Sequence, residues 1–157
     1  VVVEHQCVCL SLGITKQCIG QTCIRGCDTL LCCVNGTVIV IETTTAGDIL
    51  GVPKSKCACQ VGLGAVLSIM DRSTIYDQGL LETAVSVADE KNIKWQYKNV
   101  VAGGNEAGEY QRGAAGAKVL AISAPARYIH SASNVLKMSD MESVADLVSA
   151  LNERSFD

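Results

Sequence analysis

The sequence has little charge and few aromatic residues. Charged residues make up 18% of its 157 residues and aromatic residues 4%, and the net charge is −3, with no block of like charges. This excludes the dense positive charge on which tight binding to nucleic acid or to an anionic membrane surface depends. No apolar stretch approaches the roughly 20 residues that a bilayer-spanning helix needs. We therefore expect neither nucleic acid nor a membrane among the partners of this protein.

An initiator methionine and a basic leader with an apolar core are also lacking. A sequence without these features is expected of a processed chain or of a fragment, and we favour a truncated chain. Apolar residues nevertheless make up 48% of the sequence, which is enough to form a core and argues against global disorder. The length fits one domain, or a small domain with an appendage.

The nine cysteines lack the spacing of a metal site. Seven lie within the first 33 residues, namely Cys7, Cys9, Cys18, Cys23, Cys27, Cys32 and Cys33, and the other two are Cys57 and Cys59. No two of them form the C-x-x-C pair with which a tight turn grips one zinc ion, and an odd number leaves one thiol over in any fully paired scheme. We therefore favour reduced cysteines in a cytoplasmic chain. A metal- or redox-binding module built on the cysteines stays open as an alternative.

The chain divides into two parts of different character. Residues 1–36 contain no aromatic residue, only four charges and no sustained hydrophobic period, whereas regular patterns begin at Thr37. We therefore expect a Cys-rich segment at 1–36 and a folded part at 37–157.

The folded part alternates between strand and helix patterns. Strands are expected at 37–42, 65–70, 93–101 and 117–123, and helices at 78–91, at 107–115 and from Ser139 to Leu151. The β-branched run 37–42 is typical of a strand buried on both faces, and Ser139 with Glu142 forms a capping box for the last helix. The alternation predicts a layered α/β fold with a mostly parallel sheet and helices on both faces.

Ligands of such sheets bind in the loops beyond the carboxyl ends of the strands. A strand-end acid such as Glu42 is either a metal ligand or the point where the chain meets water, and a loop histidine such as His130 is either a ligand or an exposed residue. The stretch 103–108 lacks the G-x-G-x-x-G spacing of a nucleotide site. It is either a tight turn whose Asn105 caps a helix or a loop that lines a site.

Four ordered stretches carry a resemblance to a known family. They are Val38-Ile39-Val40-Ile41-Glu42-Thr43-Thr44-Thr45-Ala46-Gly47-Asp48, Ile69-Met70-Asp71-Arg72-Ser73-Thr74-Ile75-Tyr76, Val101-Ala102-Gly103-Gly104-Asn105-Glu106-Ala107-Gly108 and Ile122-Ser123-Ala124-Pro125-Ala126-Arg127-Tyr128-Ile129-His130-Ser131. Together they resemble the C-terminal part of the glutamyl-aminopeptidase family of dinuclear metallopeptidases, the self-compartmentalising TET-type enzymes, some of which carry an endoglucanase label. The resemblance implies a zinc-peptidase-like fold for residues 37–157.

The resemblance also implies roles for single residues. Glu42 and His130 would each ligate one of two divalent ions, which are zinc, cobalt or manganese. Residues lining the substrate pocket would be Gly104, Asn105, Glu106 and Arg127. In such a site, the two ions polarise a peptide carbonyl and activate a bridging water, while a glutamate moves the proton. Peptide substrates and a homo-oligomer follow as expected partners.

The sequence departs from the family pattern before Glu42. The family's first histidine ligand, its bridging aspartate and its Glu-Glu pair belong there, yet the stretch Thr15–Gln21, where the pair is expected, contains no acid. The catalytic residues are therefore unknown. Because a catalytic zinc needs three protein ligands, we expect the isolated chain to hydrolyse peptides poorly. An inactive oligomerisation or interaction remnant is the alternative.

Two explanations account for this departure. A truncated coding sequence whose start is read out of frame would explain both the abrupt change of composition and the missing acids. True divergence of residues 1–36 is the other explanation. We favour the first, because the later motifs are intact.

Overall fold

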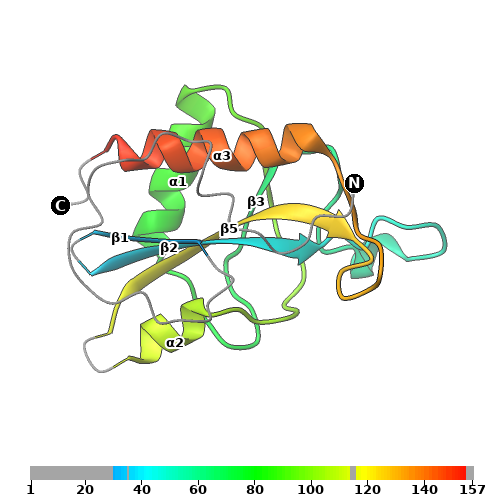
Figure 1. Ribbon diagram of the computed structural model, residues 1–157, viewed down its shortest axis with the longest axis horizontal. Coiled ribbons are helices and arrows are strands. Elements are labelled where there is room, and N and C mark those ends of the chain that lie inside the picture. Colours follow the sequence, from blue (N-terminus) through cyan, green and yellow to red (C-terminus); the bar gives the residue numbers. More distant parts are fainter. Residues whose placement is uncertain (1–29, 35, 114–115, 155–157) are drawn as a thin grey trace.

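The computed structural model describes residues 30–34, 36–113 and 116–154, with only the backbone described for 30–34. The elements in chain order are β1 (Leu30–Val34), β2 (Thr37–Thr45), the 3-10 turn η2 (Lys54–Lys56), β3 (Ala65–Leu67), α1 (Gln78–Glu90), β4 (Trp95–Tyr97), α2 (Ala107–Arg112), β5 (Lys118–Arg127), β6 (Val135–Leu136) and α3 (Met138–Asn152). Figure 1 shows a sheet with α1 and α3 above it and α2 below it. The described residues thus form a layered α/β fold, as predicted.

The centre of the sheet is the parallel pair β2 and β5. Its register runs from Thr37 opposite Lys118 to Thr45 opposite Ala126. Alternate residues of the two strands face opposite sides and both sides are buried, so that Val40 and Ile122 are wholly inaccessible to solvent. This explains why both strands are almost continuously apolar.

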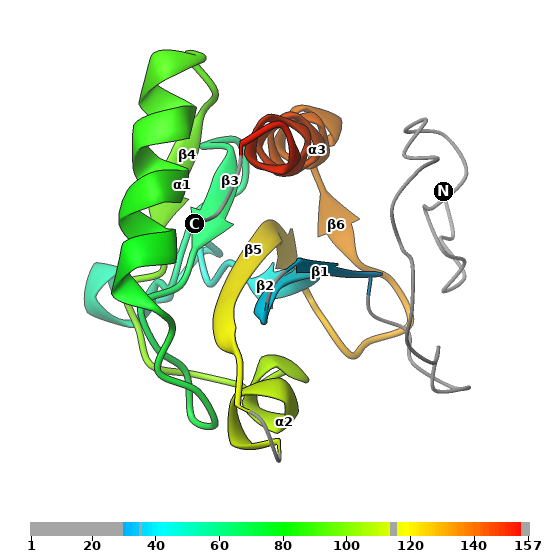
Figure 2. The same ribbon diagram turned by 90° about the vertical axis from the view of Figure 1, so that its left-hand side faces the viewer.

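Helices cover both faces of this pair, also as predicted (Figure 2). One face of β2 and β5, with Ile39, Leu120 and Ile122, packs against α1 and α3. The other face, with Val38, Val40, Val119 and Ala121, packs against Tyr76 and Ala107, the first residue of α2. The apolar stripe predicted for the helix at 78–91 is the buried stripe of α1, where Leu80, Leu81, Ala84, Val87 and Ala88 are buried.

The sheet is mixed, whereas we expected it to be mostly parallel. Its strand order is β1-β2-β5-β3-β4, with β6 beside the end of β5. The pairs β2·β5 and β3·β4 are parallel, but β1·β2, β3·β5 and β5·β6 are antiparallel. Periodicity reports which residues are buried and not in which direction a neighbouring strand runs, so the prediction had no basis for the direction of β3.

Several element boundaries differ from the prediction. β3 ends at Leu67 because the chain leaves the sheet as a hairpin in which Met70 pairs with Ile75. β4 is confined to Trp95–Tyr97, and α2 ends at Arg112. β5 continues through Pro125, which lies beyond the residues of β5 that pair with β3 and so removes no hydrogen bond there.

The predicted capping box of the last helix is wrong. α3 begins at Met138, its N-cap is Lys137, and no side chain caps it. The side chain of Ser143 donates to the backbone oxygen of Ser139. Asp140 in the first turn instead accepts hydrogen bonds from the backbone amides of Gly62, at 2.6 Å, and Gly64, at 2.9 Å. The start of α3 is therefore anchored to the loop before β3.

The strand β1 falls within the predicted Cys-rich segment 1–36 and pairs with β2, from Leu30 opposite Ile41 to Val34 opposite Thr37. Residues 1–29 lie outside the described residues, and the two-part division stays a prediction. No helix among the described residues is long and apolar enough to cross a membrane.

Candidate functional site

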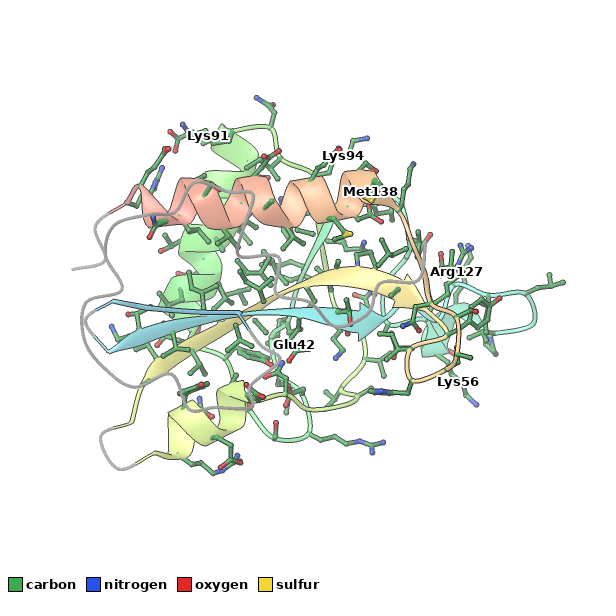
Figure 3. The ribbon with its side chains drawn as sticks, in the orientation of Figure 1. Glu42, Lys56, Lys91, Lys94, Arg127 and Met138 are labelled. Atoms are coloured by element: carbon green, nitrogen blue, oxygen red, sulfur yellow. The ribbon has the colours of Figure 1, made fainter. Side chains whose placement is uncertain are left out.

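Glu42 lies on the α2 side of the sheet. It follows Val38 and Val40 on the same side of β2, stands opposite Ser123 of β5, and is half-buried. Figure 3 shows it beneath the middle of the sheet. It lies three residues before the end of β2, so that it belongs to the strand itself and not to the loop after it.

A buried carboxylate, Asp71, lies at the turn of the hairpin after β3. Its Oδ1 accepts from the backbone amides of Ser73 and Thr74, at 2.7 and 2.9 Å, and from the hydroxyl of Ser73 at 2.9 Å. Its Oδ2 accepts from the phenol of Tyr76 at 2.6 Å. Burial alone would raise the pKa of Asp71, but these hydrogen bonds outweigh burial and hold the pKa below its ordinary value. Asp71 is therefore a charged, fully satisfied anchor.

Tyr76 connects this anchor to the loop before α2. Its phenol oxygen accepts from the side-chain amide of Asn105 at 2.9 Å while it donates to Asp71. Burial raises the pKa of Tyr76, and the charges of Asp71 and Glu42 raise it further. Val38 and Val40 of β2 pack against Tyr76, and Glu42 follows them on the same side of the strand.

The predicted pocket residues Gly104 and Asn105 lie against the same turn. Arg72 donates its backbone amide to Gly103, and a Cβ atom added at Gly104 would lie 2.9 Å from the hydroxyl oxygen of Ser73. The side chain of Asn105 accepts from the amide of Ala107 at 2.9 Å, which places it at the start of α2 as its predicted capping role requires. Glu106 is the N-cap residue of that helix, without a side-chain capping bond.

Arg127, the other predicted pocket residue, forms an ion pair elsewhere. Its guanidinium donates twice to the carboxylate of Asp48, at 2.9 and 2.7 Å, and the same carboxylate accepts from the amide of Val61. The bonds from Arg127 outweigh burial and lower the pKa of Asp48. Figure 3 shows Arg127 at the end of β5, away from Glu42. The structure does not bring this guanidinium to the Glu42 cluster.

His130 lies in an exposed turn beyond β5. Its backbone φ is 64° and that of Tyr128 is 62°, so two residues of a tight turn adopt the left-handed region. The described residues contain no group of three or more His, Cys, Asp or Glu side chains that is able to hold a metal ion. Glu42 and His130 thus do not complete a metal centre within the described part of the chain. Their role as ligands stays a prediction.

Asp71, Tyr76 and Lys98 are not predicted as site residues from the sequence, although Asp71 and Tyr76 lie in one of the stretches that carry the family resemblance. The ammonium group of Lys98 is half-buried and donates to the backbone oxygen of Ala102 at 2.7 Å. Burial lowers its pKa, and the charge of Asp71 opposes that effect. An Asp side chain that bonds to backbone amides two residues on is a common turn, and the sequence Asp71-Arg72-Ser73-Thr74 is compatible with such a turn.

A family model supplies the first comparison with known proteins. The model described as M42 glutamyl aminopeptidase matches residues 25–147. This is most of the chain, and it includes Glu42, Asp71, Tyr76 and Asn105. It also begins before Thr37, where regular patterns start in the sequence.

Known relatives agree with the family model. FrvX of Escherichia coli (strain K12), which carries an aminopeptidase name, is 29% identical over 111 residues, which are 71% of this chain and 31% of FrvX. An aminopeptidase from the archaeon Desulfurococcus kamchatkensis matches with a TM-score of 0.72 and 30% identity over 74% of this chain and 34% of its own.

A third relative, the TET1 peptidase of Pyrococcus horikoshii, matches with a TM-score of 0.56 and 28% identity over 72% of this chain and 32% of its own, and is described as assembling into a tetrahedron or a large octahedral shell. The chain spans about a third of the length of these relatives.

Proposed function

Because this chain belongs to the M42 glutamyl aminopeptidase family, we propose that it is the C-terminal part of a metal-dependent aminopeptidase, which removes residues from the amino ends of peptides. The observation that carries the proposal is the family match over residues 25–147, combined with the position of Glu42 on the side of β2 that packs against Tyr76.

The metal ions that this function needs do not fit the described residues alone. A catalytic zinc site takes three protein ligands and an open position, while Glu42 and His130 supply two ligands at most. We therefore propose that hydrolysis by the isolated chain is impaired. The remaining ligands would come from chain that precedes Glu42 in the family pattern, and we derive no catalytic step from this part alone.

A homo-oligomer and a cytoplasmic location belong to the same proposal. The assembly described for the Pyrococcus horikoshii relative supports the first. The cysteine spacing, which fits neither a fully paired scheme nor a zinc site and so favours reduced thiols, supports the second.

An inactive interaction remnant is the second candidate function. Leu50, at the tip of the loop between β2 and η2, is fully exposed, and Ile49 beside it is 36% exposed. Exposed apolar side chains at one tip are typical of a contact surface. Light scattering tests this candidate, since a monodisperse monomer would contradict an assembly role.

The impairment is tested on the purified chain. Zinc, cobalt or manganese is added, bound metal is measured by elemental analysis, and hydrolysis of leucine- and glutamate-p-nitroanilide is followed. We expect no turnover above that of a Glu42→Gln variant. Turnover with stoichiometric metal would contradict the impairment and support the aminopeptidase.

The ligand roles are tested in a chimera. Residues 37–157 replace the matching part of the Desulfurococcus kamchatkensis aminopeptidase, and kcat/KM is measured. We expect an active chimera in which Glu42→Gln and His130→Ala each lower kcat/KM by at least about 100-fold, since a metal ligand matters at least as much as the groups that support it. Glu153→Gln, an exposed acid after α3, is the matched control. A folded but inactive chimera would contradict the proposed function, and an active one insensitive to both changes would contradict the ligand roles.

A further inference from the structure

The strand β4 lies at the edge of the sheet, on the side opposite β1 (Figure 2). In the part of the chain that the structure describes, it pairs only with β3, in parallel. The amide of Ala65 donates to the carbonyl of Lys94, and the amide of Lys98 donates to the carbonyl of Leu67, each at 2.9 Å. In a parallel pair with this register, the residues of β4 that bond to β3 are therefore Lys94, Gln96 and Lys98.

The backbone groups of Trp95 and Tyr97 point away from β3. Successive residues of a strand direct their amide and carbonyl groups to alternate sides, so these two residues present two N–H and two C=O groups at the outer edge. Among the described residues, no strand, loop or side chain forms a hydrogen bond with these four groups. Such a row of backbone groups is a template on which another extended segment adds a strand.

Side chains on both faces hold this edge in place. On one face, the side chain of Gln96 accepts from the backbone amide of Gln60 at 2.9 Å and donates to the carbonyl of the same residue at 2.8 Å. On the other face, the indole of Trp95 donates to Asp89 at 2.8 Å, and its ring meets that of Tyr97 edge to face, with the centroids 4.8 Å apart. Because β4 is already fixed, a segment that binds there loses little affinity to ordering the strand.

The two faces of this edge differ in their chemistry. The side chains of Lys94 and Lys98 lie on the face of Gln96, whereas the rings of Trp95 and Tyr97 lie on the other face. Lys94 is exposed and forms no ion pair with any described residue, and Lys98 is half-buried. Side chains directly opposite each other on neighbouring strands interact, so an added strand suits this edge when it places acids beside the lysines and apolar residues beside the rings.

A second copy of β4 fits this edge poorly. The antiparallel register that uses all four free backbone groups places Lys94 of each chain opposite Lys98 of the other. Like charges directly opposite each other destabilise a pair of strands, and lysines on an edge are a common protection against such self-pairing. The charges therefore indicate a different occupant, in which acidic and apolar residues alternate.

We propose that β4 is a docking edge at which an extended peptide segment with alternating acidic and apolar residues adds a strand. The segment exchanges backbone hydrogen bonds with Trp95 and Tyr97, places an acid opposite Lys94, and packs its apolar side chains beside the two rings. The strands β3 and β5 separate this edge from β2, which carries Glu42. The proposal therefore does not depend on the proposed function.

Trp95 is the only tryptophan of the chain, so tryptophan fluorescence reports directly on this edge. The whole chain is titrated with a backbone-cyclised hairpin peptide without tryptophan, whose outer strand reads Glu-Val-Thr-Val-Glu. The control hairpin reads Lys-Val-Thr-Val-Lys. A cyclic peptide has no amino end, so binding to an aminopeptidase site is not measured. We expect a saturable change with the acidic hairpin and a dissociation constant at least about fivefold higher for the basic one.

Backbone changes test the added strand. Tyr97→Pro removes an amide hydrogen that points away from β3, so the pairing with β3 persists while the edge loses a donor. We expect this variant to lose binding of the acidic hairpin, and Tyr97→Val, which keeps the amide, to bind it within about threefold of the wild type. An acidic hairpin N-methylated at both valines lacks the matching donors, and we expect the wild-type chain not to bind it. This peptide keeps the test valid if Tyr97→Pro fails to fold.

Charge changes test the occupant. We expect Lys94→Glu to reverse the preference between the two hairpins, and Lys56→Glu, at an exposed lysine well apart from Lys94 in Figure 3, to leave it unchanged. Equal affinity for both hairpins, no saturable change with the acidic one, or full binding of the N-methylated peptide would each overturn the proposal. A wild-type dimer in light scattering that Tyr97→Pro converts into a monomer would assign the edge to a second copy, and would overturn it as well.

Discussion

The phenol oxygen of Tyr76 lies 2.6 Å from a carboxylate oxygen of Asp71 and donates its hydrogen to it, inside a buried cluster. Through the side chain of Asn105, the same phenol reaches the start of α2. This one hydroxyl therefore joins the hairpin after β3 to the loop before α2, which are nearly 30 residues apart in sequence.

Removing this hydroxyl is expected to destabilise the chain without changing its shape. Tyr76→Phe keeps the ring but leaves Asp71 without one donor and the amide of Asn105 without its acceptor. We expect the free energy of unfolding in urea to fall by about 2 kcal/mol, because buried polar groups then lack partners. Tyr97→Phe, which removes the hydroxyl of a partly exposed ring in β4, is expected to change it by less than about 0.5 kcal/mol. Equal effects of the two variants would contradict the bridging role.

The charge of Asp71 predicts how stability depends on pH. Its pKa in the folded chain lies below the ordinary value of 3.8, so the unfolded chain takes up this proton first as the pH falls. The stabilisation is therefore complete above the unfolded pKa and is lost as the pH falls through the folded pKa. Asp48 shifts in the same direction because of Arg127.

We expect the free energy of unfolding, measured in urea, to decline below about pH 4. In the Asp71→Asn variant we expect this decline to be less steep. The variant is also expected to be about 2 kcal/mol less stable near neutral pH, because hydrogen bonds to a charged carboxylate are lost. Acid curves of equal slope for the wild type and Asp71→Asn would contradict this account.

The pair of Arg127 and Asp48 predicts a difference between arginine and lysine. The guanidinium makes two parallel hydrogen bonds to the carboxylate, and an ammonium group makes only one of them. We expect Arg127→Lys to lower the thermal midpoint measurably and Arg72→Lys, at an exposed position, to leave it unchanged. A midpoint unaffected by Arg127→Lys would show that the pair is only a surface contact.

Substituting alanine at two glycines distinguishes the cost of a strained backbone from the cost of a steric clash. Gly64 has φ 90°, and a Cβ atom there would lie 2.1 Å from the carbonyl oxygen of Lys94, while Gly51 has φ 88° and open space around it. We expect Gly51→Ala to cost about 1 kcal/mol, which is the strain alone. Gly64→Ala is expected to cost more than about 3 kcal/mol, because backbone atoms must also move. Similar unfolding free energies for both variants would contradict the assigned clash.

The elements themselves were largely predictable from local patterns. The buried face of α1 follows from apolar residues three and four apart, and β2 follows from a β-branched run, because burial on a helix or strand repeats with a fixed period. The hairpin at 69–76 escaped prediction, since Ile69 and Met70 continue the apolar run of β3 although they are 51% and 39% exposed. Composition does not show where a strand leaves its sheet.

The site was predictable only in part. Glu42 and Asn105 are predicted from their positions after or at the end of strands; Asn105 donates to Tyr76, and Glu42 lies on the side of β2 that packs against Tyr76. Asp71 is not predicted as a site residue, because its importance comes from four donors that only the folded turn brings together. Arg127 was assigned to a pocket, yet its partner Asp48 lies 79 residues earlier.

The sequence by itself determined the α/β class, the apolar faces and the family, because these depend on periodicity and on short ordered motifs. Only the tertiary structure decided which polar groups meet. The carboxylate of Asp140 accepts a hydrogen bond from the amide of Gly64, although the two residues are 76 positions apart in the sequence. A hydrogen bond acts over about 3 Å and has no sequence period, so its partners are set by the packing of the strands and helices that carry them.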